Sequence, residues 1–235
     1  MIMGLLSDAH GNAEALEGCL DAIERQGAER IYFLGDAVGY FPEENAVLEL
    51  LRSREAICIR GNHEAMLLGK LTIPEPRDTV YRLADASTRL HDRHRAWMQD
   101  WPDRLELSLD GCRVLLVHGS PADPIQGYLY PDSDLTPLRE LPFDLVAMGH
   151  THRPFLTSAG PVTVMNVGSS GMPRDVGNLA SCARYDTKTG AAEILRVPFD
   201  ASGLARRWGD RIDPSAAACL RRVADGPVIG RTVPA

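Results

Sequence analysis

The chain has 235 residues, a length that fits one α/β domain or two small ones and can bury a core without disulfide or metal staples. Hydrophobic residues make up 44% and charged residues 24%, values typical of a soluble globular protein. The formal net charge of −7 argues against a protein that binds nucleic acid through a basic face, although bound divalent cations would make a local site positive.

Short apolar runs alternate with helical patterns in the first part of the chain. The runs at residues 2–6, 31–34 and 56–59 predict three strands. A helical pattern between the first two strands begins after Asn12, a suitable N-cap, and stops at Gly27. A second helix is expected at residues 43–52. This βαβαβ order predicts a parallel sheet with right-handed crossovers.

The later part of the chain predicts a long helix and a second sheet. Residues 78–99 carry several charges and predict one long helix. A hairpin follows at 105–109 and 113–117, joined by the turn pair Asp110-Gly111. A strand is expected at 145–148. Short, closely spaced strands then predict a second, largely antiparallel sheet, at residues 155–157, 162–165, 181–185 and 192–197.

The cysteines and the N-terminus bear on where the protein is found. The five cysteines are widely spaced without a CxxC pair, so we expect reduced, buried thiols. The N-terminus lacks a basic segment followed by a long apolar one. No run approaches the roughly 18 apolar residues that a membrane helix needs. We therefore expect a cytoplasmic protein with no membrane partner.

Polar side chains follow the predicted strands where these end: Asp8, His10, Asp36, Asn62, His63, His118, His150 and His152. Ligands bind at the carboxyl ends of strands in an open parallel sheet, so we expect these residues to meet. Carboxylate and amide oxygens mixed with imidazoles suit Mn, Fe, Zn, Co or Ni rather than Ca. His91 and His94 differ, because they lie on the charged helix 78–99, where we expect a solvated face.

Five motifs appear in order along the chain: Ser7-Asp8-Ala9-His10-Gly11-Asn12, Leu34-Gly35-Asp36, Arg60-Gly61-Asn62-His63-Glu64, Val117-His118-Gly119 and Met148-Gly149-His150-Thr151-His152. Together they resemble the calcineurin-like metallophosphoesterases, and segment 35–42 looks like that of small prokaryotic phosphodiesterases. The resemblance implies an α/β fold, a four-layer αββα sandwich of two mixed sheets flanked by helices. We expect this domain to cover residues 1–200. Residues 201–235 would form a C-terminal helical extension and tail packed on it.

The resemblance also implies a role for each motif residue. Seven side chains would hold two divalent transition-metal ions, with Mn favoured: Asp8, His10 and His152 the first ion, Asn62, His118 and His150 the second, and Asp36 both. His63 would not be a ligand but would stabilise or protonate the departing oxygen. Arg153 and Arg174 lie on predicted site loops, where an arginine contacts phosphate or faces solvent. We take Arg153 and Tyr40 as the candidate substrate-binding residues.

Departures from the family pattern favour a phosphodiester substrate. Protein phosphatases of the superfamily carry Gly-Asp-x-x-Asp-Arg-Gly, whereas here Gly39 and Tyr40 stand where that second Asp and the Arg would be. This difference leaves open what orients His63. Because the Arg that would bind the phosphate is absent, we expect the substrate to be a small-molecule phosphodiester. Its hydrolysis would proceed by in-line attack of a metal-bridging hydroxide.

Other functions remain as alternatives. A phosphomonoesterase acting on a protein or a nucleotide is the main one. A metal-poor scaffold for protein partners and a nuclease are less favoured, because the ligand set is complete and the charge is acidic. The sequence leaves open whether the protein forms a homo-oligomer.

Overall fold

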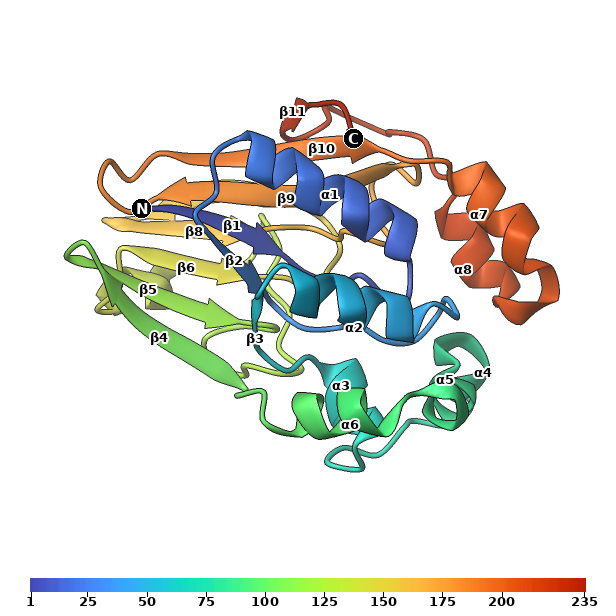
Figure 1. Cartoon of the computed structure of the whole chain (residues 1–235). Helices are drawn as coiled ribbons and strands as arrows, with labels where there is room; N and C mark the ends of the chain where they lie inside the picture. Colours follow the sequence, from blue (N-terminus) through green and yellow to red (C-terminus); the bar gives the residue numbers. More distant parts are fainter.

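Two β-sheets pack face to face in the computed structural model, which describes residues 1–235 (Figure 1). The first sheet has the strand order β11-β10-β9-β1-β2-β3 and the second the order β4-β5-β6-β8-β7. The strands of the first sheet are β1 (Ile2–Leu6), β2 (Arg30–Phe33), β3 (Ile57–Cys58), β9 (Leu179–Asp186), β10 (Ala192–Pro198) and β11 (Arg231–Thr232). Those of the second are β4 (Arg104–Leu109), β5 (Cys112–Val117), β6 (Leu145–Met148), β7 (Phe155–Ala159) and β8 (Val162–Asn166).

The first part of the chain forms the predicted βαβαβ unit. Helices α1 (Ala13–Arg25) and α2 (Glu44–Ser53) connect three strands, and β1–β2 and β2–β3 pair in parallel. Asn12 caps α1, because its side chain accepts a hydrogen bond from the Ala15 N–H. The predicted fold class, two mixed sheets flanked by helices, is confirmed.

Successive side chains of β1 point to opposite faces of the first sheet and so contribute to two different apolar cores. Met3 and Leu5 belong to the apolar core between the sheets, which includes Val114 of β5, whereas Leu6 belongs to the core under the helices. The outer face of the second sheet is covered by a 3₁₀ helix, η1 (Thr136–Glu140), and the loop before it, which contribute Leu138 and Leu129. The fourth layer is therefore thin.

The assignment of the later strands differs from the prediction. β9 and β10 belong to the first sheet, where β9 pairs antiparallel with β1. The second sheet is mixed rather than largely antiparallel, because β6 pairs in parallel with both β5 and β8. Both faces of β9 are covered, Cys182 by the helical layer and Ala183 by the second sheet. A strand buried on both faces lacks the alternation that marks an exposed antiparallel strand.

The predicted long helix over residues 78–99 is wrong. The segment forms three short helices, α4 (Asp78–Tyr81), α5 (Leu83–Arg89) and α6 (Asp92–Gln99). Arg82 interrupts the first junction with a left-handed φ of 58°, and Leu90 is extended at the second. The Asp78 carboxylate accepts a hydrogen bond from the Leu83 N–H at 2.8 Å. This side chain replaces the backbone carbonyl that would accept the bond in a continuous helix.

His94 of α6 lies inside the protein rather than on a solvated face. Its side chain is fully buried, with Nε2 3.3 Å from a carboxylate oxygen of Glu49, whereas His91 is exposed as predicted. Burial lowers the pKa of His94, against the opposing effect of Glu49. Helix α6 is rich in charged residues, yet it places one histidine in the protein interior.

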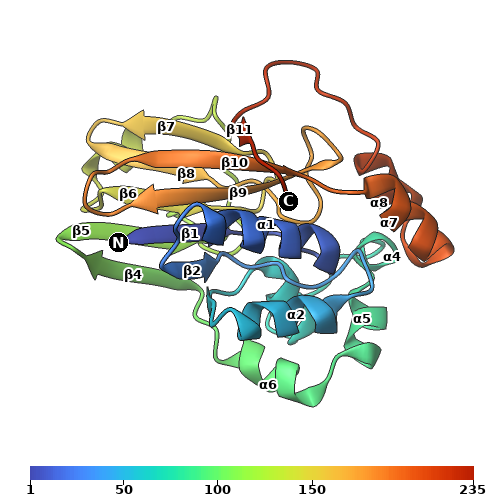
Figure 2. The same ribbon diagram turned by 45° about the horizontal axis from the view of Figure 1, so that its top comes forward.

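The C-terminal segment packs beside the carboxyl ends of β1 and β2 (Figure 2). It contains α7 (Ala201–Trp208), the 3₁₀ helix η2 (Gly209–Arg211) and α8 (Pro214–Cys219). Leu204 packs in one apolar cluster with Tyr40 and Met172. Arg222 donates a hydrogen bond to the backbone carbonyl of Arg174 at 3.0 Å. The segment therefore supports two loops at this end of the sandwich.

The cysteines are free thiols, and all but Cys219 are buried, as the sequence predicted. Burial raises the pKa of the Cys19 and Cys58 thiols well above the usual value, which keeps them protonated. None of the helices has the length and apolar character needed to span a bilayer.

Candidate metal centre

The predicted strand-end side chains meet at one rim of the sandwich. Asp8 and His10 follow β1, Asp36 follows β2, and His118 follows β5. Asn62 and His63 begin helix α3 (Asn62–Leu67), and His150 and His152 follow β6. The loops are joined by backbone hydrogen bonds, such as Asp8 N–H to the Gly35 carbonyl at 2.9 Å. All eight side chains except Asn62 are buried.

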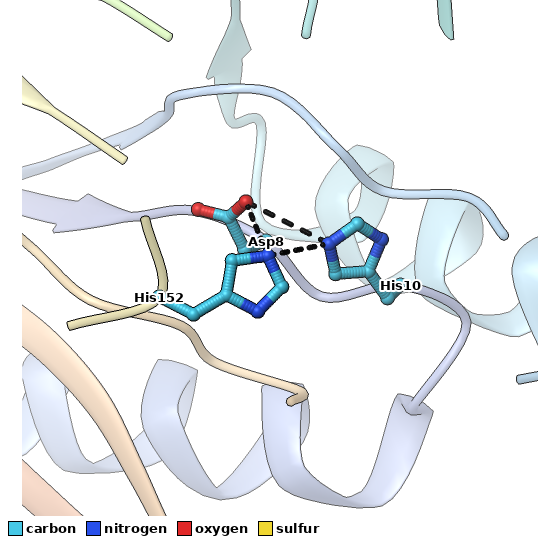
Figure 3. Close-up of side chains that lie close together, drawn as sticks. All are labelled: Asp8, His10 and His152. Carbon is cyan, nitrogen blue, oxygen red and sulfur yellow. Dashed lines mark hydrogen bonds and ion pairs between the residues drawn. The ribbon is translucent and has the colours of Figure 1, made fainter. Parts of the chain in front are cut away.

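Three overlapping groups of side chains have ligand atoms within 4.8 Å of one another: Asp8, His10 and His152; His10, Asp36 and His63; and Asp36, His118 and His150. Figure 3 shows the first group, in which both histidines turn toward the Asp8 carboxylate. Asn62 joins the third group, because its Oδ1 lies 3.0 Å from His118 Nε2. Asp36 Oδ2 lies 3.7 Å from His10 Nε2 and 3.4 Å from His118 Nε2. It is therefore placed between the two predicted ligand sets.

The orientation of the histidines fits a metal centre. Nδ1 of His10, His118 and His152 each faces a backbone carbonyl, at 3.2, 2.7 and 2.7 Å. A carbonyl there holds the proton on Nδ1, so that the Nε2 lone pair points into the cluster. The Nε2 atoms of His10 and His152 then face each other at 3.0 Å. His150 turns its Nδ1 toward His118 Nε2, 3.1 Å away, and Asp8 Oδ1 is buried without a hydrogen-bond partner. Converging lone pairs of this kind suit divalent cations.

The electrostatics of the cluster favour positive charge. Burial alone would raise the pKa of Asp8, but His152 and His10 hold it well below its usual value. The pKa of Asp36 is also strongly lowered, because His118 and His63 outweigh its burial. Burial opposes a charge on His118, yet Asp36 and Asp8 raise the pKa of His118 to about 10. The two ionised carboxylates therefore draw positive charge into this buried site, either a proton on His118 or a metal ion in its place.

The backbone around the cluster is unusual. Six of its non-glycine residues have a left-handed backbone with φ between 50° and 65°: Asp8, His10, Asp36, Tyr40, His150 and His152. A side chain disfavours this conformation, which costs of order 1–3 kcal/mol per residue in the more strained cases. Such strain persists where the surrounding contacts impose it, and it concentrates at functional sites.

The structure answers what orients His63. Its Nδ1 lies 3.1 Å from the Val38 carbonyl, and its ring packs against the rings of Tyr40 and Tyr81, with centroids 5.2 and 4.6 Å away. A Cβ on Gly39 would come within 2.5 Å of His63 Nδ1, so glycine is required for this contact. A backbone carbonyl thus replaces the acidic side chain of the phosphatase pattern. Burial lowers the pKa of His63 to about 3, although Asp36 opposes this shift.

Glu64 holds the loop after β2 in place, a role that we did not predict. Its buried carboxylate accepts hydrogen bonds from the backbone N–H groups of Asp36 at 2.8 Å, Ala37 at 2.7 Å and Gly61 at 2.9 Å. The signal in the sequence was its position three residues after Gly61, which is the capping-box position of α3. Glu64 therefore fixes the backbone on both sides of the Asp36 side chain.

Replacing Glu64 with Gln is expected to lower the free energy of unfolding by about 1–3 kcal/mol, because the new NH₂ group must face backbone N–H donors. Metal affinity should fall roughly 10–100-fold, as when a group that orients a ligand is lost. Urea unfolding and metal titration measure the two effects. Glu140→Gln, at an exposed position, is the control. Equal stability of the two variants would contradict the assignment.

The pocket over the cluster contains one of the two candidate arginines. It is lined by Asp36, Tyr40, Asn62, His63, Tyr81, Tyr128, His150, His152 and Arg174. Arg174 Nη2 lies 3.4 Å from the Tyr40 hydroxyl, and the guanidinium has no carboxylate within 4.0 Å. Arg153 is exposed and does not line the pocket, because it follows His152 out of the cluster toward solvent. Tyr40 is thus at the pocket, and Arg153 is not.

The fold and this cluster define a metal-binding α/β sandwich, and the comparison with known proteins identifies its family. Residues 1–190 match the model of the calcineurin-like phosphoesterase superfamily domain, and the chain belongs to that superfamily. An uncharacterised protein of Methanocaldococcus jannaschii is 31% identical over 85% of this chain and 88% of its own. The phosphodiesterase YfcE of Escherichia coli is 25% identical over 77% of this chain and 84% of its own.

The solved structures agree with this assignment. A metallophosphoesterase from Sphaerobacter thermophilus superposes with a TM-score of 0.75 at 26% identity, covering 94% of this chain and 98% of the other. The family resemblance seen in the motifs is therefore confirmed, and the chain contains a His/Asp cluster of the kind that could hold metal ions.

Proposed function

We propose that the protein is a dinuclear metal-dependent phosphodiesterase that acts on a small-molecule phosphoester. The observation that carries this proposal is the position of Asp36, within reach of His10 on one side and of His118 on the other. One carboxylate between two sets of ligands is what a pair of cations roughly 3.5–4 Å apart requires. The name of the Escherichia coli relative points to the same reaction.

The ligand assignment follows the groups of side chains in the cluster. Asp8, His10 and His152 would hold the first ion, Asn62, His118 and His150 the second, and Asp36 both. Of the metals that accept such a mixed set, we favour Mn. Two bound ions would lower the pKa of a water between them and polarise the phosphoryl oxygens, which prepares an in-line attack on phosphorus.

His63 would assist the departing group. Its Nδ1 is held by the Val38 carbonyl, so Nε2 is the ring atom left to meet the departing oxygen. The negative charge of a bound phosphate next to the ring would raise the pKa of His63 and favour the protonated form. A proton on Nε2 could then pass to the leaving oxygen, which is general acid catalysis.

A diester is favoured over a monoester because the pocket contains a single guanidinium, that of Arg174. A monoester dianion carries one more negative charge than a diester and normally needs more charge-assisted hydrogen bonds from the protein. We expect the manganese-loaded protein to hydrolyse bis-p-nitrophenyl phosphate with a higher kcat/KM than p-nitrophenyl phosphate. A faster monoester reaction would instead favour a phosphatase. No turnover with any of the five metals would favour a binding role.

Arg174→Gln is expected to lower kcat/KM for bis-p-nitrophenyl phosphate roughly 10–100-fold, because a charge-assisted contact of about 1.5–3 kcal/mol is lost. Metal occupancy should not change, since Arg174 offers no ligand atom. Parallel kinetics of Arg153→Gln decide between the two arginines, because that side chain faces solvent. A greater loss in Arg153→Gln than in Arg174→Gln would overturn the assignment.

A further inference from the structure

A groove opens directly beside the metal cluster. Its volume is about 270 Å³, and it shares Asn62, Tyr81, Tyr128 and His150 with the pocket over the cluster. That pocket has only about 20 Å³ of free space, little more than a water molecule occupies. A substrate whose phosphorus reacts there must therefore place its other atoms outside the pocket. The groove is the adjoining space, because it shares four of the nine residues that line the pocket.

The groove begins on the side where the leaving group would depart. Tyr81 forms part of its wall, and the Tyr81 ring lies 4.6 Å from the ring of His63. Met66, one turn of α3 beyond His63, forms another part. An oxygen that departs toward His63 therefore carries its attached group past Tyr81 and into the groove.

The wall of the groove is suited to a flat ring. Tyr128 lies over His150 with ring centroids 4.1 Å apart, yet 56% of Tyr128 is exposed. Its ring also stacks on that of Tyr130, with centroids 6.1 Å apart and planes inclined by 9°. A large aromatic side chain that packs on neighbouring rings and is still exposed at the mouth of a site offers a stacking surface.

The outer part of the groove is positively charged. Arg77 lines it and has no carboxylate within 4.0 Å, although the protein as a whole carries a net charge of −7. An unpaired guanidinium at this place suits a carboxylate or phosphate.

We propose that this groove binds the alcohol portion of the phosphoester and selects a planar ring that bears a second anionic group. The ring stacks on Tyr128, and the anionic substituent pairs with Arg77. This inference rests on the proposed phosphodiesterase function, because it assigns the group that is released toward His63.

The test compares two diesters with the manganese-loaded full chain, methyl 4-nitrophenyl phosphate and its 3-carboxy analogue. The wild type should prefer the carboxylated diester about tenfold in kcat/KM, and Arg77→Gln should abolish that preference by lowering kcat/KM for the carboxylated diester alone. Tyr128→Ala should lower kcat/KM for both about fivefold, whereas Tyr128→Phe should not. Arg139→Gln, an exposed arginine of η1, is the matched control.

Calorimetric binding of the two corresponding phosphonates, in which a CH₂ group replaces the ester oxygen between phosphorus and the ring, separates this inference from the proposed function. Hydrolysis of both diesters with equal efficiency by the wild type and Arg77→Gln would overturn the groove assignment and leave the phosphodiesterase intact. Absence of hydrolysis, together with tighter binding of the carboxylated phosphonate by the wild type than by Arg77→Gln, would support the groove and overturn the phosphodiesterase. Equal binding of both analogues by both proteins, without hydrolysis, would overturn both.

Discussion

Asp36→Asn is expected to remove metal from both sites at once. The carboxylate is buried, lies between His10 and His118, and is held in the ionised form by the histidines around it. Asn has nearly the same shape and still offers an oxygen to the His63 N–H, which donates to Asp36 Oδ1 at 2.9 Å. The variant therefore changes the charge while keeping the local backbone contact. The loss of affinity should exceed the roughly 10–100-fold caused by removing a group that only orients a ligand.

Elemental analysis and metal titration of the purified variant measure this effect, and circular dichroism checks that the fold is kept. Asp132→Asn is the control, because Asp132 is exposed and makes no hydrogen bond or ion pair. A variant that keeps two metals per chain with unchanged affinity would show that Asp36 does not bridge. Loss of one metal alone would assign Asp36 to a single site.

The position of the candidate centre could be predicted because it depends on chain order and strand direction. β1 and β2 are parallel neighbours, so Asp8 and Asp36 had to emerge at the same rim. His118 and His150 follow β5 and β6, a second parallel pair. The sequence could not show which sheet β9 would join, because strand partners depend on which apolar faces meet in three dimensions.

Other features depend on contacts that no local pattern records. The αL turn at Arg82 divides a segment whose charge pattern predicts a continuous helix. Arg174 lines the pocket and Arg153 does not, and the loop that carries Arg174 receives a hydrogen bond from Arg222, which is 48 residues further along the chain. Gly39 is needed because a side chain there would collide with His63, whose Nδ1 contacts the Val38 carbonyl, and this contact can be found only in the folded structure. Positions in chain order were therefore predictable, whereas contacts between distant loops were not.

His63→Ala is expected to lower kcat about 10²–10⁴-fold for substrates with a poor leaving group, because a proton donor in the transition state is lost. The loss should be much smaller for a nitrophenyl ester, whose leaving oxygen needs little protonation. Both metals should remain, since the three ligands of each proposed site and the bridging Asp36 are unchanged. Steady-state kinetics with an alkyl and an aryl diester, combined with elemental analysis of the same preparation, measure all three expectations.

The leaving-group dependence provides the control within a single variant, because a general fault in folding would reduce both reactions by the same factor. It also resolves an ambiguity of the cluster, where His63 lies close enough to His10 and Asp36 to act as a ligand. A ligand would be needed equally for both substrates, and its removal would cost metal occupancy. Equal losses for the alkyl and aryl diesters, accompanied by loss of metal, would therefore move His63 from proton donor to ligand. Unequal losses with full occupancy would fix it as the group that meets the departing oxygen.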